Sequence, residues 1–375
     1  IMEFRDLKAQ YKVLKQDIDS AVLDVFSSGR FIGGSPVSEL EQQLAEYVGV
    51  KHCVTCANGT DALQLALMAW GVGEGDAVIV PDFTFFSSGE VVSAVGATPI
   101  FVDVLEDTFN IDPTQIVPAC ELARQQGLEP RVVVAVDLFG LPADYRAIKD
   151  ICRRQGLFLL EDAAQGFGGS IDGQRVCSFG DISTTSFFPA KPLGCYGDGG
   201  AVFTDSDEWA ALLRSYAVHG KGSMKYDNVR IGMNSRLDTV QAAILKVKLA
   251  AFADHELADV NERAGWYAEA LAGSSLKLPV IPGGYTSSWA QYTVICPDDV
   301  DRSALQASLK NSGIPTMVYY PKPMHKQLAF ESKSLSLPCP MTDCLCERVL
   351  SLPMGPYLTR TESEKVAEAV ISNLG

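Results

Sequence analysis

The chain has 375 residues, of which 47% are hydrophobic and 21% are charged, and this balance excludes collagen-like, low-complexity and wholly disordered proteins. It carries 31 Lys and Arg residues against 46 Asp and Glu, so its formal net charge of −15 argues against a nucleic-acid-binding or anionic-membrane protein. The length predicts two domains, or one large α/β unit with an appendage.

The sequence contains neither an initial apolar run of secretory type nor a stretch near the roughly 20 apolar residues that cross a bilayer. We therefore expect a cytoplasmic protein with no membrane partner. The 10 cysteines, spread along the chain, predict reduced and mostly buried thiols. Cys53 and Cys56 lie in a β-like run, and Cys344 and Cys346 have no second spaced pair beside them, so we expect no metal site.

Short apolar strands alternate with helical stretches through the first two-thirds of the chain, which is typical of a parallel sheet covered by helices on both faces. Helices are predicted over 61–70 and 145–155, and each ends before a glycine that suits a left-handed C-terminal turn. The predicted strands span 52–56, 77–80, 98–102, 131–136, 157–160, 182–187 and 201–204. The α/β pattern thus predicts a mostly parallel, seven-stranded sheet.

A long helical stretch over about 235–272, continuous or broken once, follows the sheet region. Prolines and glycines at 279–284 then mark a linker. The remainder contains predicted strands at 291–296 and 316–320, a helix at 302–312 and a terminal helix from Glu362. We expect a large α/β domain over 1–250, which includes an N-terminal helix, and a small α+β domain over 251–375.

The most informative segment surrounds Lys191, which lies between Pro189 and Pro192 in the run Ser-Phe-Phe-Pro-Ala-Lys-Pro-Leu-Gly-Cys-Tyr-Gly-Asp-Gly-Gly (186–200). The two prolines exclude a helix here, and the neighbours of the lysine are apolar. Burial lowers the pKa of a lysine amine, and only the neutral amine attacks a carbonyl, so this setting favours a Schiff-base lysine. A surface lysine that extends from a loop is the alternative.

Other segments at the ends of predicted strands carry polar or aromatic groups. Glu161 and Asp162 end an apolar strand, where a carboxylate can hold the proton of a pyridine nitrogen or stabilise a helix start. The turn Ala-Asn-Gly-Thr (57–60) suits either a phosphate or a helix N-cap. The aromatics of 83–86 can stack on a planar ring or pack in the core. The sequence has no dinucleotide fingerprint, which argues against an NAD-dependent sugar dehydrogenase.

The lysine run resembles the lysine motif of the pyridoxal-phosphate-dependent sugar-nucleotide aminotransferases, the DegT/DnrJ/StrS family of fold type I. The runs Asn-Gly-Thr-Asp-Ala-Leu (58–63), Glu-Asp-Ala-Ala-Gln (161–165) and Asn-Ser-Arg-Leu-Asp (234–238) are similar to that family as well. The resemblance implies an aminotransferase in which Lys191 binds the cofactor covalently and then moves the proton between substrate and cofactor.

The resemblance also implies the other cofactor contacts. Asp162 would pair with the pyridinium nitrogen, Phe85 would stack on the ring, and Gln165 would lie near the ring and its hydroxyl. Asn234 would reach the phosphate of the neighbouring subunit, which implies a homodimer with shared active sites. Within one subunit, the phosphate would be held by Gly59, Thr60 and Ser186.

The lysine motif together with 234–238 most resembles members that act at C3 of UDP-2-acetamido-2-deoxy-3-keto-hexuronic acid, with L-glutamate as the amino donor, in surface-polysaccharide assembly such as that of O-antigen. This acceptor is anionic, and Arg236 is the first candidate to bind its carboxylate, since a guanidinium matches a carboxylate in shape. Further expected substrate contacts are His219, Tyr319, Tyr320 and His325, with Lys221, Arg230 and Lys322 as additional cationic candidates.

Two departures from the family pattern lie on the acceptor side. The segment His-Gly-Lys-Gly-Ser (219–223) lacks the arginine that often precedes the histidine. Tyr319-Tyr320-Pro321 stands where those relatives commonly show His-Tyr-Pro, so a contact with the sugar substrate is changed. A dTDP-linked 3- or 4-keto-6-deoxyhexose aminotransferase is therefore the alternative within the same chemistry. A non-catalytic sensor of pyridoxal phosphate or of sugar nucleotides, built on the same fold, is the alternative from another class.

Overall fold

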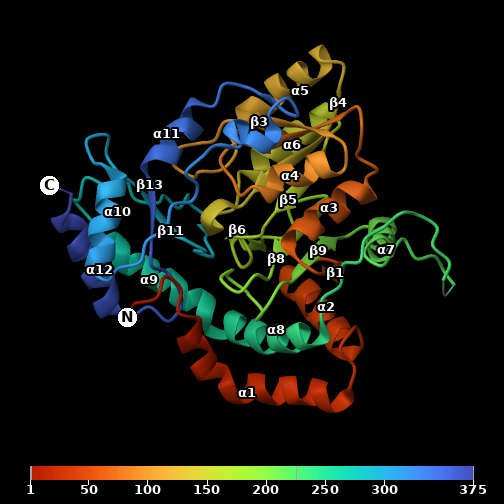
Figure 1. Cartoon of the computed structure of the whole chain (residues 1–375), viewed down its shortest axis with the longest axis horizontal. Helices are drawn as coiled ribbons and strands as arrows, with labels where there is room; N and C mark the ends of the chain where they lie inside the picture. Colours follow the sequence, from red (N-terminus) through yellow and green to blue (C-terminus); the bar gives the residue numbers. More distant parts are fainter. Residues whose placement is uncertain (1, 225, 375) are drawn as a thin grey trace.

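The computed structural model describes residues 2–224 and 226–374, and its centre is an eight-stranded sheet (Figure 1). Strand β9 runs antiparallel to β1 and β8, and the other neighbouring strands are parallel. In spatial order the strands are β1 (His52–Cys56), β9 (Gly200–Thr204), β8 (Ile182–Ser186), β5 (Phe158–Asp162), β4 (Glu129–Val136), β2 (Asp76–Pro81), β3 (Thr98–Val102) and β12 (Leu335–Ser336).

All seven predicted strands of this sheet are present, with ends that differ by at most two residues from the expected ones. The eighth strand, β12, has two residues and comes from the C-terminal part of the chain, so it is too short to leave a pattern in the sequence. The prediction of a mostly parallel α/β sheet is confirmed.

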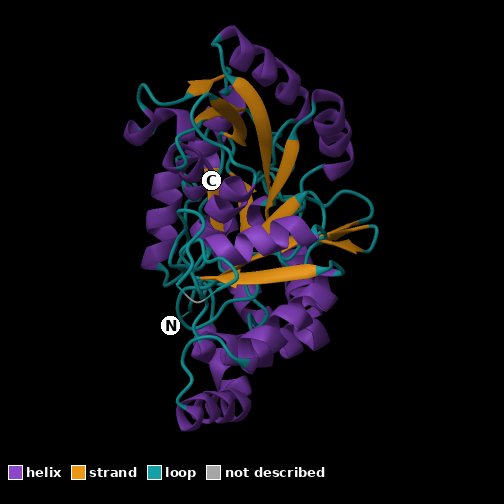
Figure 2. Ribbon diagram, turned by 90° about the vertical axis from the view of Figure 1, so that its right-hand side faces the viewer, coloured by secondary structure: helices purple, strands orange, loops and turns teal. Residues whose placement is uncertain are grey.

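Helices lie on both sides of the sheet (Figure 2), because successive strand residues face opposite cores. In β2, Val78 and Val80 pack into one core and Ile79 into the other. The core with Ile79 is covered by α2 (Ser35–Val48), α5 (Ile116–Gln125), α6 (Tyr145–Gln155) and α8 (Thr239–Ala251). The opposite core is covered by α3 (Gly59–Ala69), α4 (Ser87–Ala94) and α7 (Asp207–Tyr216).

Helix α1 (Leu7–Ser28) lies along α8 (Figure 1) and packs against its Ile244 through Leu14 and Ile18. Helix α8 continues through a π-helical turn (Phe252–Glu256) into α9 (Leu257–Ala270). The long predicted helical stretch is therefore one continuous segment. The expected domain boundary at residue 250 falls inside this segment and stays a prediction.

The C-terminal part has its own core around a two-stranded sheet of β11 (Tyr292–Ile295) and β13 (Val349–Leu352). A small sheet of β10 (Tyr285–Thr286), β6 (Ser170–Ile171) and β7 (Gln174–Arg175) joins a residue pair of this part to the chain after β5. The helices of the C-terminal part are α10 (Arg302–Asn311), α11 (Pro340–Arg348) and α12 (Arg360–Ser372).

The expected strand at 316–320 is not among these strands. Only Met317 of this segment exchanges backbone hydrogen bonds with β13, in an isolated bridge to Ser351. Pro315 and Pro321 bound the segment and offer no N–H group, so a ladder cannot extend far on either side. The end of the segment turns instead toward the carboxyl ends of the sheet strands, where Tyr320 meets Gln165.

Every helix within the described residues is too short or too polar to span a membrane. The carboxyl ends of the parallel strands β1, β2, β5 and β8 lead into the four segments in which the candidate site residues were predicted. Ligands of open α/β sheets bind at this edge.

Candidate active site

Lys191 lies in a tight loop between β8 and β9. Its backbone N–H donates to the Phe188 carbonyl (2.9 Å), and Cys195 N–H donates to the Phe187 carbonyl (2.8 Å). Gly194 is required in this loop, because a Cβ atom there would lie 2.5 Å from the Pro189 carbonyl oxygen. The sequence thus folds the loop so that the lysine side chain starts from a fixed backbone.

The amine of Lys191 has a lowered pKa, which favours its neutral, nucleophilic form. Desolvation lowers its pKa to about 8, although the carboxylate of Asp162 acts in the opposite direction. The guanidinium of Arg5 adds to the lowering of this pKa. The neutral form of the amine, which is the form that attacks a carbonyl, is therefore more populated at neutral pH than in an ordinary lysine.

Asp162 ends β5 and is 5% exposed. Its Oδ2 accepts a hydrogen bond from Ser88 Oγ (2.7 Å), which is also 3.0 Å from Thr84 Oγ1, and its Oδ1 accepts from Ala164 N–H (3.2 Å). Burial raises the pKa of Asp162, while the Ser88 hydroxyl, the Ala164 N–H and the charge of Lys191 oppose that rise. This buried carboxylate lies close enough to Lys191 for the two charges to act on each other.

The neighbouring carboxylate, Glu161, has a different environment because successive strand residues point to opposite faces. Its two oxygens accept hydrogen bonds from Ser183 Oγ and from three backbone N–H groups, those of Cys177, Phe179 and Gly180. Glu161 therefore fixes the chain before β8, and Asp162 alone of the pair faces Lys191.

The turn at the start of α3 has the features of an anion-binding site. Asn58 caps the helix by accepting from Asp61 N–H (2.8 Å), and Thr60 Oγ1 lies 2.7 Å from Ser87 Oγ. A Cβ atom on Gly59 would lie 2.7 Å from Ser186 Cβ, so only glycine lets this turn pack on the end of β8. Backbone N–H groups at a helix N-terminus and nearby hydroxyls suit a phosphate.

Gln165 connects these groups to the C-terminal part of the chain. Its Oε1 accepts from Phe139 N–H (2.7 Å), and its Nε2 donates to the Tyr320 hydroxyl (3.0 Å). The ring of Tyr320 lies 6.2 Å from that of Phe85, which remains 53% exposed. A half-exposed aromatic face beside Gln165 offers a surface on which a planar ring can stack.

His325 is paired with the buried carboxylate of Asp82. Its Nδ1 lies 2.6 Å from Oδ2 of the fully buried Asp82, and its backbone N–H donates to Oδ1 of the same carboxylate (2.8 Å). This pairing ties the segment after Tyr320 to the end of β2, so Nδ1 is not directed at a ligand. Tyr319 packs at 5.6 Å from the Tyr320 ring and at 6.3 Å from that of Phe4.

The structure does not bring the remaining predicted residues to Lys191. His219, Asn234 and Arg236 belong to the loop between α7 and α8, and within the described residues their hydrogen bonds do not reach Lys191, Asp162 or Gln165. Asn234 Oδ1 accepts from Arg236 Nη2 (2.8 Å).

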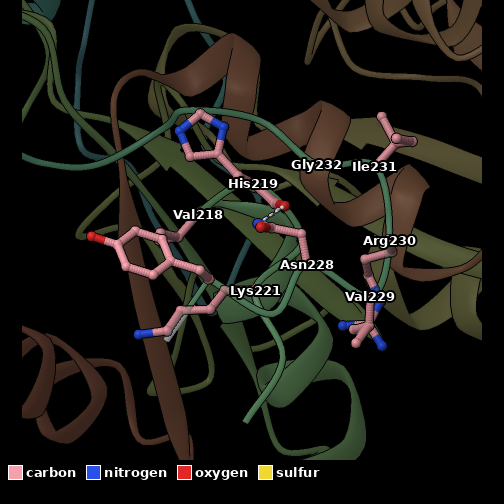
Figure 3. Close-up of a pocket in the computed structure, with 9 residues that line it drawn as sticks. Val218, His219, Lys221, Asn228, Val229, Arg230, Ile231 and Gly232 are labelled. Atoms are coloured by element: carbon pink, nitrogen blue, oxygen red, sulfur yellow. Dashed lines mark hydrogen bonds between the residues drawn. The ribbon is translucent and has the colours of Figure 1, made fainter. Parts of the chain in front are cut away.

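The same loop forms an open hollow of about 920 Å³ (Figure 3). The carbonyl of His219 accepts a hydrogen bond from Asn228 Nδ2 (2.8 Å) across it. Among the described residues, Lys221 and Arg230 are the lysine and arginine that line the hollow, and the Arg230 guanidinium donates to Ser215 Oγ. The loop thus offers a second cluster of candidate substrate contacts, separate from Lys191.

Two residues near Lys191 escaped the sequence prediction. Ser88 donates to Asp162 from 74 positions away in sequence, and Arg5 reaches the Lys191 loop from the N-terminus. Ser88 lies in no motif, and Arg5 lies in the run Glu-Phe-Arg-Asp-Leu (3–7), where the resemblance to the family begins but to which the sequence alone assigns no role.

The assembled groups fit pyridoxal phosphate. The helix N-terminus with its hydroxyls suits the phosphate, the buried carboxylate suits a protonated pyridine nitrogen, and the amine of lowered pKa suits the aldehyde. The residues that would hold the group are Gly59, Thr60, Phe85, Asp162, Gln165, Ser186 and Lys191. These residues therefore match the chemistry of the phosphate, the ring nitrogen and the aldehyde of the cofactor.

Known proteins resemble the chain over its whole length. A model of the DegT/DnrJ/EryC1/StrS aminotransferase family matches residues 12–371. The UDP-2-acetamido-2-deoxy-3-oxo-D-glucuronate aminotransferase of Pseudomonas aeruginosa is 44% identical over 373 residues, with 100% of both chains covered. The UDP-N-acetyl-3-dehydro-α-D-glucosamine 3-aminotransferase of Acidithiobacillus ferrooxidans is 41% identical, with 97% of this chain and 96% of the relative covered.

A solved structure supports the same relationship. The crystal structure of a DegT DnrJ EryC1 StrS aminotransferase from Brucella abortus matches with a TM-score of 0.96 and 46% identity, and the match covers 100% of both chains. The lysine loop, the strand-end carboxylate and the helix turn described above thus lie in a fold of known chemistry. The chain belongs to the DegT/DnrJ/EryC1/StrS aminotransferase family.

Proposed function

We propose that the protein transfers the amino group of L-glutamate to the C3 keto group of a UDP-linked 2-acetamido-2-deoxy-3-keto-hexuronic acid, for the assembly of a surface polysaccharide. The observation that carries the chemistry is the Lys191 amine, with its pKa lowered to about 8, beside the buried Asp162. The choice of acceptor is supported by the full-length relatives at 44% and 41% identity, both named for amino transfer to 3-oxo sugars.

Pyridoxal phosphate supplies an electron-withdrawing ring and carries the amino group from donor to acceptor. Lys191 moves the proton between the substrate carbon and the carrier, because its neutral amine is a base of suitable strength at neutral pH. Asp162 would supply a negative charge to the ring nitrogen, and the turn at Gly59 and Thr60 would hold the phosphate. Glutamate leaves as 2-oxoglutarate before the keto-sugar enters, so the two half-reactions share one site.

A homodimer with shared sites is part of the proposal. Apolar side chains gather on α1 and the turn that follows it, where Leu23 is 60%, Phe26 is 55% and Phe31 is 48% exposed. A second copy of the chain would cover them. The dimer would also bring the loop of Asn234 and Arg236 to the Lys191 site of the partner, which explains why this loop stays apart from Lys191 within one chain.

The acceptor side is assigned to that loop. Arg236 would bind the carboxylate of the sugar in a two-point contact, and the cations around the hollow, Lys221 and Arg230, would face the pyrophosphate. An acidic chain with a net charge of −15 needs such a local cluster to hold an anionic substrate.

The experiment compares kcat/KM for three acceptors: the UDP-linked 3-keto-hexuronic acid, its analogue without the C6 carboxylate, and a dTDP-linked 3-keto-6-deoxyhexose. The parent enzyme should prefer the first, and Arg236→Gln should reduce that preference roughly tenfold or more by removal of a charge-assisted contact. Lys310→Gln, which removes an exposed cation on α10, is the control and should leave the preference unchanged. Equal rates with and without the carboxylate, or a preference for the dTDP-linked sugar, would refute the proposed acceptor.

A further inference from the structure

A cluster of buried and half-buried charged groups lies next to the Lys191 loop, outside the residues proposed to hold the cofactor. Arg5, Lys248 and Glu256 come from the segment before α1, from α8 and from the π-helical turn. Lys248 is 1% exposed, and desolvation lowers its pKa to about 8. Lys248 and Glu256 are buried, and Arg5 is half-buried with a buried Nη1. Desolvation of charged groups is costly, so their arrangement calls for an explanation beyond packing.

Arg5 is the member of this cluster that reaches the lysine loop. Its Nη2 donates to the carbonyl of Pro192, the residue after Lys191 (3.4 Å), and its stem passes Gly355, where a Cβ atom would lie 3.6 Å from Arg5 Cγ. The backbone next to it is fixed as well, because Met354 N–H donates to the Phe4 carbonyl (2.9 Å). The arginine is therefore clamped between the C-terminal part of the chain and the loop of Lys191.

The environment of Arg5 leaves part of its guanidinium unsatisfied. Nη1 is buried and has no hydrogen-bond partner within the described residues. Glu256 favours the charged form of Arg5, yet its oxygens accept from Gln10 Nε2 (2.9 and 3.0 Å) and from the Tyr357 hydroxyl (2.7 Å). Burial lowers the pKa of Arg5 to about 10, so it stays charged at neutral pH and its charge is not neutralised by a direct ion pair with Glu256.

We propose that Arg5 is a positioning residue for Lys191, which fixes the turn of Lys191 and Pro192 through the Pro192 carbonyl and places a permanent positive charge beside the lysine amine. Two charged groups face that amine, Asp162 from β5 and Arg5 from the segment before α1. Asp162 favours the ammonium form and Arg5 favours the neutral form. The cofactor needs the negative charge of Asp162, but this charge also raises the pKa of Lys191 and favours its protonated form. Arg5 lowers the pKa of Lys191 and so opposes this effect.

The inference rests on the proposed role of Lys191, so the experiment separates the two. Apoprotein is mixed with pyridoxal phosphate at a series of pH values and quenched with borohydride. The lysine amine adds to the aldehyde, water leaves, and the hydride reduces the resulting C=N bond to a stable secondary amine. Mass spectrometry locates the label, and its initial rate is plotted against pH. Labelling of the parent at Lys191 tests the proposed function, and the midpoint of the pH profile tests the role of Arg5.

Arg5→Met should move the midpoint upward by roughly half a pH unit or more, because it removes a like charge beside the amine. Arg5→Lys, which retains a positive charge, should leave the midpoint close to that of the parent. Lys248→Met is the matched control: it removes another buried cation of the cluster, one that acts on Arg5 and is not among the groups that act on Lys191. Its midpoint should stay unchanged.

Arg5→Met leaves Lys248 beside Glu256 but removes one of the two cations on which Glu256 acts, and can thereby destabilise the fold. The double variant Arg5→Met with Glu256→Gln removes both charges and should show the same upward shift. A midpoint equal to that of the parent in both variants, with the label still on Lys191, would overturn the proposal and leave Arg5 a purely structural residue. A lower labelling rate without a shift of the midpoint would refute the electrostatic role of Arg5 and leave only its hydrogen bond to the Lys191 turn.

Discussion

At the scale of single residues, Glu161 and Asp162 make a sharp comparison, because they are adjacent carboxylates with different partners. Asp162→Asn should leave the fold intact and slow the first half-reaction by roughly 100-fold or more, since the charge opposite the pyridinium is lost. Single-turnover absorbance changes with glutamate measure this effect. The Oδ1 of asparagine can accept from Ala164 N–H while its Nδ2 donates to the Ser88 hydroxyl, which can accept as well as donate, so thermal unfolding should change little.

Glu161→Gln should lower the stability of the fold and leave the rate of the half-reaction unchanged. Its amide nitrogen would face backbone N–H groups of Phe179 or Cys177, and two donors cannot pair, so the free energy of unfolding should fall by about 1–3 kcal/mol. Denaturant unfolding gives this value, and the folded fraction should keep its half-reaction rate. Loss of the half-reaction in Glu161→Gln with normal stability would contradict the division of roles.

The sequence predicts residues of this site well where each lies in a short run at the end of a strand, as Lys191, Asp162 and Gly59 do. It fails for Ser88, because the partner of this serine is 74 positions away and a serine has no intrinsic preference that marks it. His325 illustrates the reverse error: a histidine expected to contact substrate has its Nδ1 beside the buried Asp82, a pairing visible only once β2 and the C-terminal part are folded together.

At the scale of elements, the close approach of α3 to β8 is what places the phosphate turn. Gly59→Ala would put a Cβ atom 2.7 Å from Ser186 Cβ and 3.3 Å from its Cα, so the helix must move away from the strand. The affinity for pyridoxal phosphate should fall roughly tenfold or more, as expected for overpacking at a fixed contact. Equilibrium titration of apoprotein, followed by absorbance, measures the change.

The control for this substitution is Gly265→Ala on α9. A Cβ atom at Gly265 meets no heavy atom within 4 Å, so alanine should stabilise the helix by about 0.5–1 kcal/mol and leave cofactor affinity unchanged. An unaltered affinity in Gly59→Ala would show that the turn does not hold the phosphate.

The sequence predicts an element well when the whole element follows one hydrophobic pattern, and the seven predicted sheet strands are examples. The segment 316–320 was misread as a strand because its apolar and aromatic residues match the pattern of a buried strand. The flanking prolines, Pro315 and Pro321, and the hydrogen bond of Tyr320 with Gln165 outweigh that local preference. The conformation of this segment is therefore set in part by a tertiary contact, which the local sequence pattern does not reveal.

At the scale of the whole molecule, the proposed dimer makes activity depend on assembly. Phe26→Asp places a charge on the exposed apolar face of α1 and should shift the protein from twice its 40.4 kDa chain mass toward the monomer. Because the loop of Asn234 would then lose access to the partner site, activity should fall together with the dimer fraction. Analytical ultracentrifugation over a range of concentrations, with activity measured in parallel, provides the test.

Ile371→Asp is the matched control, since Ile371 is 45% exposed on α12 and lies outside the proposed interface. It should leave both mass and activity unchanged. A Phe26→Asp variant that is fully active as a monomer would rule out shared active sites.

The central claim, that Lys191 links pyridoxal phosphate and drives amino transfer from glutamate, is tested most directly by the absorption spectrum of the purified holoprotein before and after addition of L-glutamate, with Lys191→Ala alongside. The parent should show the visible band of a lysine-bound cofactor, and glutamate should convert it to the shorter-wavelength band of the amino form of the cofactor. Lys191→Ala should lack the initial band and fail to convert. A parent protein without the visible band, or a Lys191→Ala variant that converts at the parental rate, would contradict the account.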